Sequence, residues 1–267
     1  MKNFNSIFFQ SIKLCLLFFV FSAIAFSQTQ KADEKAEAII KKAVQNLGGE
    51  KYLNVKSQIG RGKFSVLREG GVISFQSFTD VIVFPDKERT EFKGSGSKTV
   101  QTNVGETGWI FDGDAEMIKE QTPVQVANFK RGIRVSLDNL LRGNWRKDGV
   151  LTYIGKRQAT LGKRNDAVKL VYPDGLTVEF EFSDEGFPVK AIYKMTNPDG
   201  EETTEEDRYA QFIEVQGIKT PFIIDRFSNG KPSSRVNYES IEYDKNISDS
   251  VFAKPNSPKE AKKDVKL

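Results

Sequence analysis

The sequence of 267 residues contains no histidine, and Cys15 is its only cysteine. Without histidine, neither a Ser-His-Asp triad nor a Cys-His pair can form, and zinc loses its usual nitrogen ligand. An enzyme made from this chain would have to use a pair of carboxylates or a serine–lysine pair. We therefore expect a protein without catalytic activity, without a cofactor and without a metal site.

The first 27 residues have the features of a secretory signal peptide. Lys2 and Lys13 precede an apolar run over 14–26, which is shorter than the ~20 residues needed to span a bilayer. Ala-Phe-Ser at 25–27 offers small residues to a signal peptidase, so we predict cleavage after Ser27. A membrane anchor that stays attached is the alternative.

The predicted mature chain has little net charge and no thiol. Cleavage takes away Cys15, together with two of the 40 basic residues and none of the 36 acidic ones, which leaves a net charge of +2. The mature chain therefore forms no disulfide, although its expected compartment is oxidising. A charge so close to zero argues against nucleic acid as a partner.

Two segments show the spacing of amphipathic helices. In 33–47, Asp33 suits a helix start and Gly48-Gly49 a stop, and the apolar positions are Ala36, Ile39, Ile40, Ala43, Val44 and Leu47. In 122–141 the apolar positions are Val126, Phe129, Ile133, Leu137 and Leu140. Each helix has one apolar stripe, so we expect each to lie on another element.

Most of the remaining chain alternates between apolar and polar residues, which is typical of strands. In 176–182, for example, every second residue is apolar: Leu176, Val178, Phe180 and Phe182. Pro-Asp turns at 85–86, 173–174 and 198–199 separate such runs, which favours an antiparallel meander. We expect one domain over 28–253, followed by a disordered tail over 254–267 that is rich in lysine and proline.

The acidic residues offer no convincing catalytic or metal site. Glu179 and Glu181 alternate with the apolar positions, so we expect solvated carboxylates on the polar face of a strand. The acidic cluster in 201–207 is most simply an exposed strand entry. Asp112 opens a sequence like that of a calcium loop, but Met117 stands where the loop needs glycine, which leaves an ordinary turn.

The order of the motifs resembles a known family. A helix ending in Leu-Gly-Gly precedes FPDKERTEF (84–92) and GETGWIFDG (105–113); after the helical insertion come GIKTPFIIDRF (217–227) and SDSVFAKP (248–255). This order, over about 35–255, is similar to that of the outer-membrane lipoprotein carrier and sorting proteins, the LolA-like superfamily, and particularly its uncharacterised bacterial relatives.

The resemblance implies an α+β fold, in which a strongly curved antiparallel sheet forms an unclosed β-barrel and helices cover its concave face. It also implies a monomer in the periplasm that carries acyl chains of lipoproteins or lipids towards the outer membrane, between donor and acceptor membrane proteins, without catalysis. In such carriers an arginine before the proline turn latches the helical lid. Here Phe84 holds that place, and Arg89 lies beyond the turn.

A hydrophobic cavity on the concave face is therefore the expected binding site. Its predicted lining combines apolar residues of the strands and of the inserted helix: Ile73, Phe75, Val81, Val83, Trp109, Phe111, Phe129, Ile133, Leu137, Leu176, Val178, Phe180 and Phe182. A sensor or protein-interaction domain with a filled core is the alternative, because the same residues would also build an ordinary interior.

Overall fold

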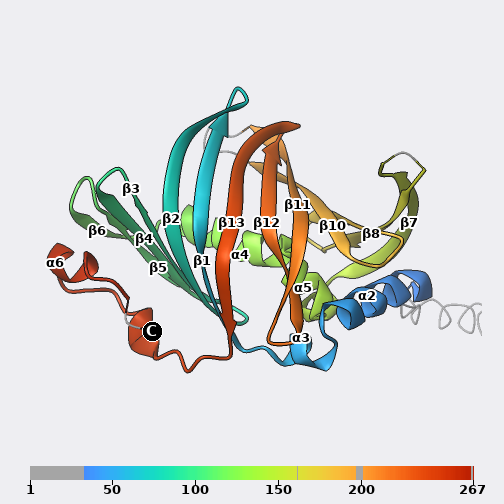
Figure 1. Cartoon of the computed structure of the whole chain (residues 1–267), viewed down its shortest axis with the longest axis horizontal. Helices are drawn as coiled ribbons and strands as arrows, with labels where there is room; N and C mark the ends of the chain where they lie inside the picture. The colour runs from blue at the N-terminus through green and yellow to red at the C-terminus, as the bar shows by residue number, and fades with distance from the viewer. Residues whose placement is uncertain (1–32, 161, 197–200, 266) are drawn as a thin grey trace, which may run out of the picture.

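A curved antiparallel sheet of thirteen strands dominates the part of the chain that the computed structural model describes, residues 33–160, 162–196, 201–265 and 267 (Figure 1). The strands are β1 (Ser57–Arg68), β2 (Gly71–Val83), β3 (Lys87–Gly94), β4 (Ser97–Val104), β5 (Thr107–Asp112), β6 (Met117–Glu120), β7 (Val150–Gln158), β8 (Arg164–Val171), β9 (Thr177–Phe182), β10 (Pro188–Thr196), β11 (Glu202–Val215), β12 (Ile218–Ser228) and β13 (Lys231–Tyr243). The predicted signal peptide, 1–27, lies outside the described residues.

Two meanders meet in the middle of this sheet. The strand order is β6-β5-β4-β3-β2-β1-β13-β12-β11-β10-β9-β8-β7, so the first and last strands of the chain are neighbours. The strands β6 and β7 remain at opposite edges, which leaves the barrel unclosed, as predicted. The pairing is antiparallel throughout the described strands.

The helices are few and short. They are α2 (Glu34–Leu47), α3 (Glu50–Asn54), α4 (Pro123–Val135), α5 (Leu137–Leu141), η1 (Asn144–Lys147), η2 (Asp249–Val251) and α6 (Pro258–Ala261). Helix α2 starts as predicted, because the Asp33 carboxylate accepts hydrogen bonds from the amides of Lys35 and Ala36 at 3.0 and 3.2 Å. It ends at Gly48, whose φ of +130° suits glycine.

The inserted helix predicted over 122–141 is broken in two. Ser136 has an extended backbone, with ψ near 152°, and its side chain accepts a hydrogen bond from the amide of Asn139 at 3.1 Å. It therefore caps the start of α5 while ending α4. The apolar spacing continues across this break, which is why periodicity alone suggested one helix.

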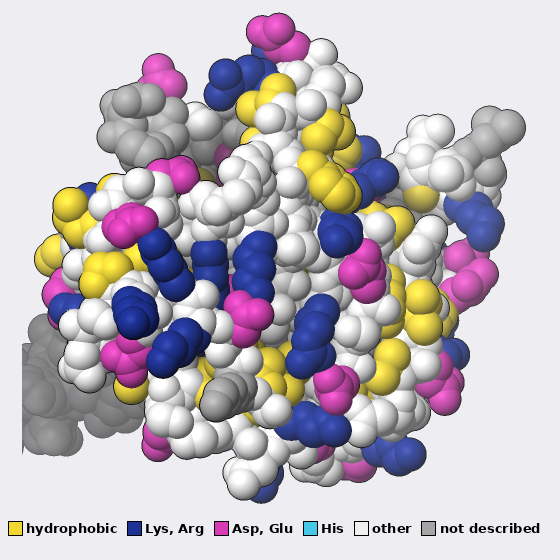
Figure 2. All heavy atoms as spheres, turned by 60° about the vertical axis from the view of Figure 1, so that its left-hand side comes forward, with side chains coloured by type: hydrophobic (Ala, Val, Ile, Leu, Met, Phe, Trp, Pro, Cys, Tyr) yellow, Lys and Arg dark blue, Asp and Glu magenta, His cyan; other side chains and the backbone are white. Residues whose placement is uncertain are grey.

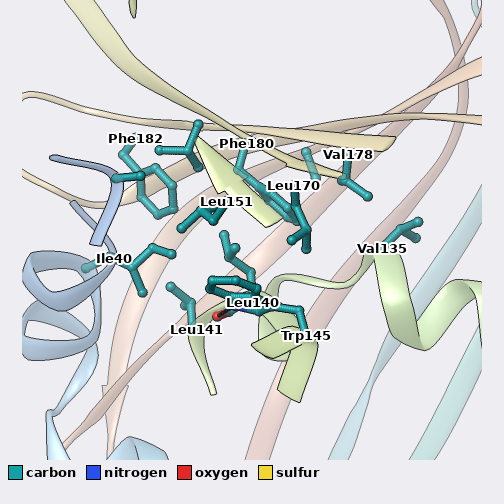
Figure 3. Packing of buried hydrophobic residues seen from close by; sticks show 14 of the residues in the cluster. Ile40, Val135, Leu140, Leu141, Trp145, Leu151, Leu170, Val178, Phe180 and Phe182 are labelled. Atoms are coloured by element: carbon teal, nitrogen blue, oxygen red, sulfur yellow. Dashed lines mark hydrogen bonds between the residues drawn. The ribbon is translucent and has the colours of Figure 1, made fainter. Parts of the chain in front are cut away.

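One face of the sheet, which we call the inner face, carries the main core. Val178 and Phe180 on β9 pack with Ile40 of α2 and with Leu140 of α5, and Trp145 of η1 completes the cluster (Figure 3). The side chains of Val178 and Phe180 are fully buried. This end of the inner face is therefore filled by side chains from the helices.

The opposite face, which we call the outer face, has apolar clusters of its own. Ile59 lies opposite Val81, and Val100 lies opposite Phe111, so each pair shares a face. These residues pack beneath residues 246–265, which we call the C-terminal strap.

The part of the C-terminal strap from residue 254 onwards, which we predicted to be disordered from its composition, is packed against the sheet. The strap contains η2 and α6, and Ala261 is buried against Val100 and Phe111. The sheet also supplies donors to its backbone, since Trp109 Nε1 donates to the carbonyl of Phe252 at 2.9 Å and Lys98 Nζ to that of Lys263 at 2.6 Å. The disorder prediction rested on the local content of lysine and proline. It could not include these hydrogen-bond partners, which lie over 140 residues away in the sequence.

The outer face also changes the interpretation of the two glutamates of β9. Glu181 is buried, with side-chain exposure of 2%, instead of solvated. Asn165 donates to it at 2.9 Å, and Arg157 and Lys190 lie 3.4 and 3.5 Å away. Neighbouring strands thus neutralise a carboxylate that alternation alone places in water.

Candidate functional site: a cavity between two helices and the sheet

A cavity of about 770 Å³ lies between α4–α5 and the middle of the inner face. Gly132 and Leu137 line it from the helices, and Tyr193, Tyr209 and Ile224 line it from the sheet. Its volume falls in the range of roughly 300–1,000 Å³ that is usual for small-molecule sites. The sheet thus has a filled inner face at β7–β9 and a hollow one at β10–β13.

The apolar part of the lining consists of aliphatic side chains and tyrosine rings. Its members are Leu47, Tyr52, Ile82, Val135, Leu137, Tyr193, Met195, Tyr209, Pro221, Ile224, Tyr238 and Tyr243. Tyrosine presents a large apolar ring together with one polar end. Such a lining suits a ligand that is mostly apolar but has hydrogen-bonding groups.

A polar belt crosses the same cavity. Asp207 of β11 lies opposite Arg226 of β12, with Asp207 Oδ1 3.6 Å from Arg226 Nε. Glu205, two residues before Asp207, accepts a hydrogen bond from the Ser228 hydroxyl at 2.7 Å. Burial raises the pKa of Asp207 above its ordinary value, although the charge of Arg226 acts in the opposite direction.

A second pair of carboxylates lies on β2 and β3. The hydroxyl of Thr90 is 2.8 Å from Asp80 Oδ1 and 3.3 Å from Glu88 Oε1. One hydroxyl proton cannot serve both acceptors at once. Burial, followed by the nearby charge of Glu88, raises the pKa of Asp80 well above its ordinary value, and burial also raises that of Glu88.

Arg142, the residue that directly follows α5, attaches this helix to the end of α3. Its Nε lies 3.1 Å from Asp138 Oδ1, and its Nη1 donates to the carbonyls of Leu53 and Val55 at 3.1 and 3.0 Å. Its guanidinium also lies 4.1 Å from the ring centroid of Phe84. The aromatic residue before the proline therefore lies in the turn after β2, and the arginine that contacts it directly follows α5.

Arg89 has a different role. It lies on the outer face, where it donates to Glu91 Oε1 at 2.6 Å from Nη2 and to the carbonyl of Val251 at 2.8 Å from Nη1. Lys98 Nζ is 3.0 Å from the other oxygen of Glu91. These three charged side chains are buried beneath the C-terminal strap and do not line the cavity.

Comparison with known proteins gives a fold but no sequence family. No family model and no curated protein matches the sequence. The solved structures that are similar include a DUF1329 family protein from Desulfovibrio piger, with a TM-score of 0.57, 13% identity and coverage of 82% of this chain and 97% of that one.

Two further solved structures are similar to this chain. A LolA superfamily protein from Nitrosomonas europaea has a TM-score of 0.54 and 14% identity, over 82% of this chain and 97% of the other. A domain from Vibrio parahaemolyticus, described as an outer membrane lipoprotein-sorting protein, has a TM-score of 0.53 and 9% identity, over 81% and 97%. The fold is LolA-like.

Within the described residues, no helix combines the length and the apolar character needed to span a bilayer.

The cavity has one of the thirteen predicted lining residues, Leu137. Phe129 and Ile133 lie on the same helical insertion but line a neighbouring cavity of about 220 Å³, next to Phe84 and Glu88. The helical insertion therefore lines both cavities, whereas none of the ten other predicted lining residues does.

Four predicted lining residues lie in the filled core of the inner face. They are Leu176, Val178, Phe180 and Phe182, which pack against α2, α5 and η1 (Figure 3). Their alternation correctly indicates the inner face. It does not distinguish a wall that a helix covers directly from one that faces a cavity.

Four other predicted residues lie on the outer face, contrary to the expectation. They are Val81, Val83, Trp109 and Phe111, and they pack beneath the C-terminal strap. The reason is that the strap gives the outer face of β1–β6 an apolar cover of its own. Alternation shows that a strand has an apolar face but not on which side of the sheet that face lies.

Ile73 and Phe75 lie at the far end of the β1–β2 hairpin, outside the cavity. Their exposed fractions are 55% and 61%, and the nearby Val72 is 60% exposed. Strand β2 pairs with β3 only from Ser77 onwards, so the hairpin projects beyond its neighbour. Figure 2 shows hydrophobic side chains on this projection.

The predicted lining contains neither the polar belt nor any of the five tyrosines of the cavity. Asp207 was placed in an exposed acidic cluster, yet it lies half-buried in the cavity, as does Tyr209 two residues later. The sequence does contain one indication of this lining, because Asp207, Tyr209 and Arg226 lie inside long segments that were predicted to be strands. Charged and phenolic side chains in central strands need a polar or hollow interior, because an unpaired buried charge is costly. In the described part of the chain, no group of three or more acidic residues could hold a metal ion.

Proposed function

We propose that this protein is a periplasmic monomer that holds the acyl chains of a lipoprotein or lipid in the cavity, for transport towards the outer membrane, without catalysis. In this proposal α4 and α5 cover the concave face and separate the chain from water. The signal peptide predicted over 1–27 would deliver the protein to the periplasm, and donor and acceptor membrane proteins would load and unload it.

The observation that carries the proposal is the cavity of about 770 Å³ between the α4–α5 segment and the sheet. Burial of an acyl chain contributes about 0.8 kcal/mol per methylene, so a moderate length of chain gives useful reversible affinity. The LolA-like fold supports this function, since one similar structure is described as a lipoprotein-sorting domain. The aliphatic and tyrosine lining is compatible with such a chain.

Ile224 offers a direct test because it lines the cavity from the sheet. We expect the purified protein to bind a fluorescent fatty acid, and Ile224→Glu to weaken this binding at least tenfold, or about 1.4 kcal/mol. The matched control is Ile223→Glu, because Ile223 is the adjacent half-buried residue of β12 and points to the outer face. Circular dichroism should show that both variants remain folded.

The alternative is a sensor or protein-interaction domain of the same fold. The filled core at β7–β9 is the observation that favours it. If the wild-type protein binds no fluorescent fatty acid, and native mass spectrometry of protein purified from its own envelope finds no lipid, the carrier proposal is wrong. If Ile224→Glu binds the probe as well as Ile223→Glu does, the cavity is not the binding site.

A further inference from the structure

Arg226 is a charged residue in the cavity, close enough to Asp80, Glu88 and Asp207 for its charge to act on each of them. It lies on the inner face of β12 and lines the cavity, and its side chain is 48% exposed. Among the residues that the structure describes, its one ion pair is with Asp207, from Nε at 3.6 Å. No described residue accepts a hydrogen bond from its guanidinium, so the two terminal nitrogens are free to bind another group.

The surroundings of Arg226 add neutral donors. Tyr209 lies opposite Ile224, one inner-face position from Arg226, and Tyr238 lies on the neighbouring strand β13. Both tyrosines line the cavity. Neither hydroxyl has a hydrogen-bond partner within the described part of the chain, whereas the Tyr193 hydroxyl lies 3.4 Å from Asp207.

We propose that Arg226, together with Tyr209 and Tyr238, binds the anionic oxygen group of the amphiphile whose chain occupies the cavity. The group is a carboxylate or a phosphate, because the planar guanidinium matches both with two parallel hydrogen bonds. Asp207 pairs with the Nε side of the guanidinium at 3.6 Å, which leaves the terminal nitrogens available to the ligand. This inference rests on the proposed function and specifies the polar end of its ligand.

The neighbouring carboxylates do not prevent an anion from binding. Burial raises the pKa values of Asp80 and Glu88, so protonation of these two groups removes negative charge at a smaller cost than for solvated acids. Asp207 is already paired with Arg226. Glu205 is hydrogen-bonded by Ser228. A cationic head group would instead seek these carboxylates, and this is the competing outcome of the test.

The first experiment compares four ligands with the same saturated chain on the full wild-type protein. Hexadecanoate, hexadecyl phosphate, hexadecanol and hexadecylamine compete with a neutral fluorescent probe, below their aggregation concentrations and at neutral pH. We expect hexadecanoate or hexadecyl phosphate to bind at least tenfold more tightly than hexadecanol and hexadecylamine. The order of the two anions distinguishes a fatty-acid head from a phosphorylated head.

The second experiment assigns the preference to Arg226. Arg226→Gln should reduce the affinity for the preferred anion to that for hexadecanol, while hexadecanol binding changes less than twofold. The matched control is Arg235→Gln, because Arg235 is an exposed arginine that pairs with Asp225 outside the cavity. It should keep the wild-type order of affinities.

Three results overturn the inference. If wild-type protein binds hexadecanol as tightly as the anions, or binds hexadecylamine most tightly, the head-group assignment is wrong while acyl binding stands. If Arg226→Gln keeps the anion preference, another group recognises the head. If none of the four chains binds, the proposed function fails together with the inference. The wild-type comparison requires no variant to fold.

Discussion

Replacing Phe180 with alanine distinguishes a filled core from a cavity wall. Phe180 is fully buried, and it lies opposite Val168 on β8 and Ala191 on β10, both of which are fully buried as well. These neighbours belong to paired strands and cannot move into the space without distorting the sheet. We therefore expect Phe180→Ala to lower the free energy of unfolding by about 4 kcal/mol, within the ~3–5 kcal/mol range for such changes.

Urea unfolding of the purified protein measures this loss, provided that the slope of the free energy of unfolding against urea concentration is the same in the variant and the wild type. Phe75→Ala is the matched control, because Phe75 is 61% exposed; its cost should stay below about 0.5 kcal/mol. Under conditions where Phe180→Ala is folded, its affinity for a fluorescent fatty acid should equal that of the wild type. A stability loss below about 1.5 kcal/mol with weakened binding would show that Phe180 lines an accessible pocket, contrary to our account.

Two further predictions concern buried charges. Glu91→Gln removes the carboxylate that lies 2.6 Å from Arg89 and 3.0 Å from Lys98. It should lower the free energy of unfolding, measured in urea, by about 3–5 kcal/mol, because both cations stay buried. A decrease below about 1 kcal/mol would contradict this burial. Burial raises the pKa of Asp80, so the folded state retains a proton that the unfolded state releases above about pH 4. The free energy of unfolding therefore falls as the pH rises through the raised pKa of the folded state. Asp80→Asn should reduce this fall above about pH 4, and an unchanged pH profile would refute the assignment.

Local patterns predict the strands and α2 because their causes are local. Alternation and Pro-Asp turns indicate an antiparallel meander, and Asp33 and Gly48 mark the two ends of α2. Ser136 was missed because it interrupts the backbone without interrupting the apolar spacing. The sequence shows only a single serine at this position, and a lone capping residue is a weak signal for the start of a new helix.

The cavity was harder to predict because its position depends on contacts between distant segments. Trp109 and Phe111 have the spacing of a buried face, but that face is covered by the C-terminal strap. Phe180 faces inward, but α2 and α5 fill the space in front of it. Tyr209 and Arg226 were overlooked because an apolar cavity was expected, whereas the observed cavity has a polar belt.

The location of a bound chain tests the central claim most directly. A fatty acid with a photoreactive diazirine on its chain, activated on the full protein and mapped by mass spectrometry, identifies the residues that contact it. Our account predicts cross-links to the cavity wall around Leu137, Tyr209 and Ile224, and their loss when unlabelled fatty acid competes. Cross-links confined to the exposed tip at 72–75, or none that unlabelled fatty acid suppresses, would contradict it.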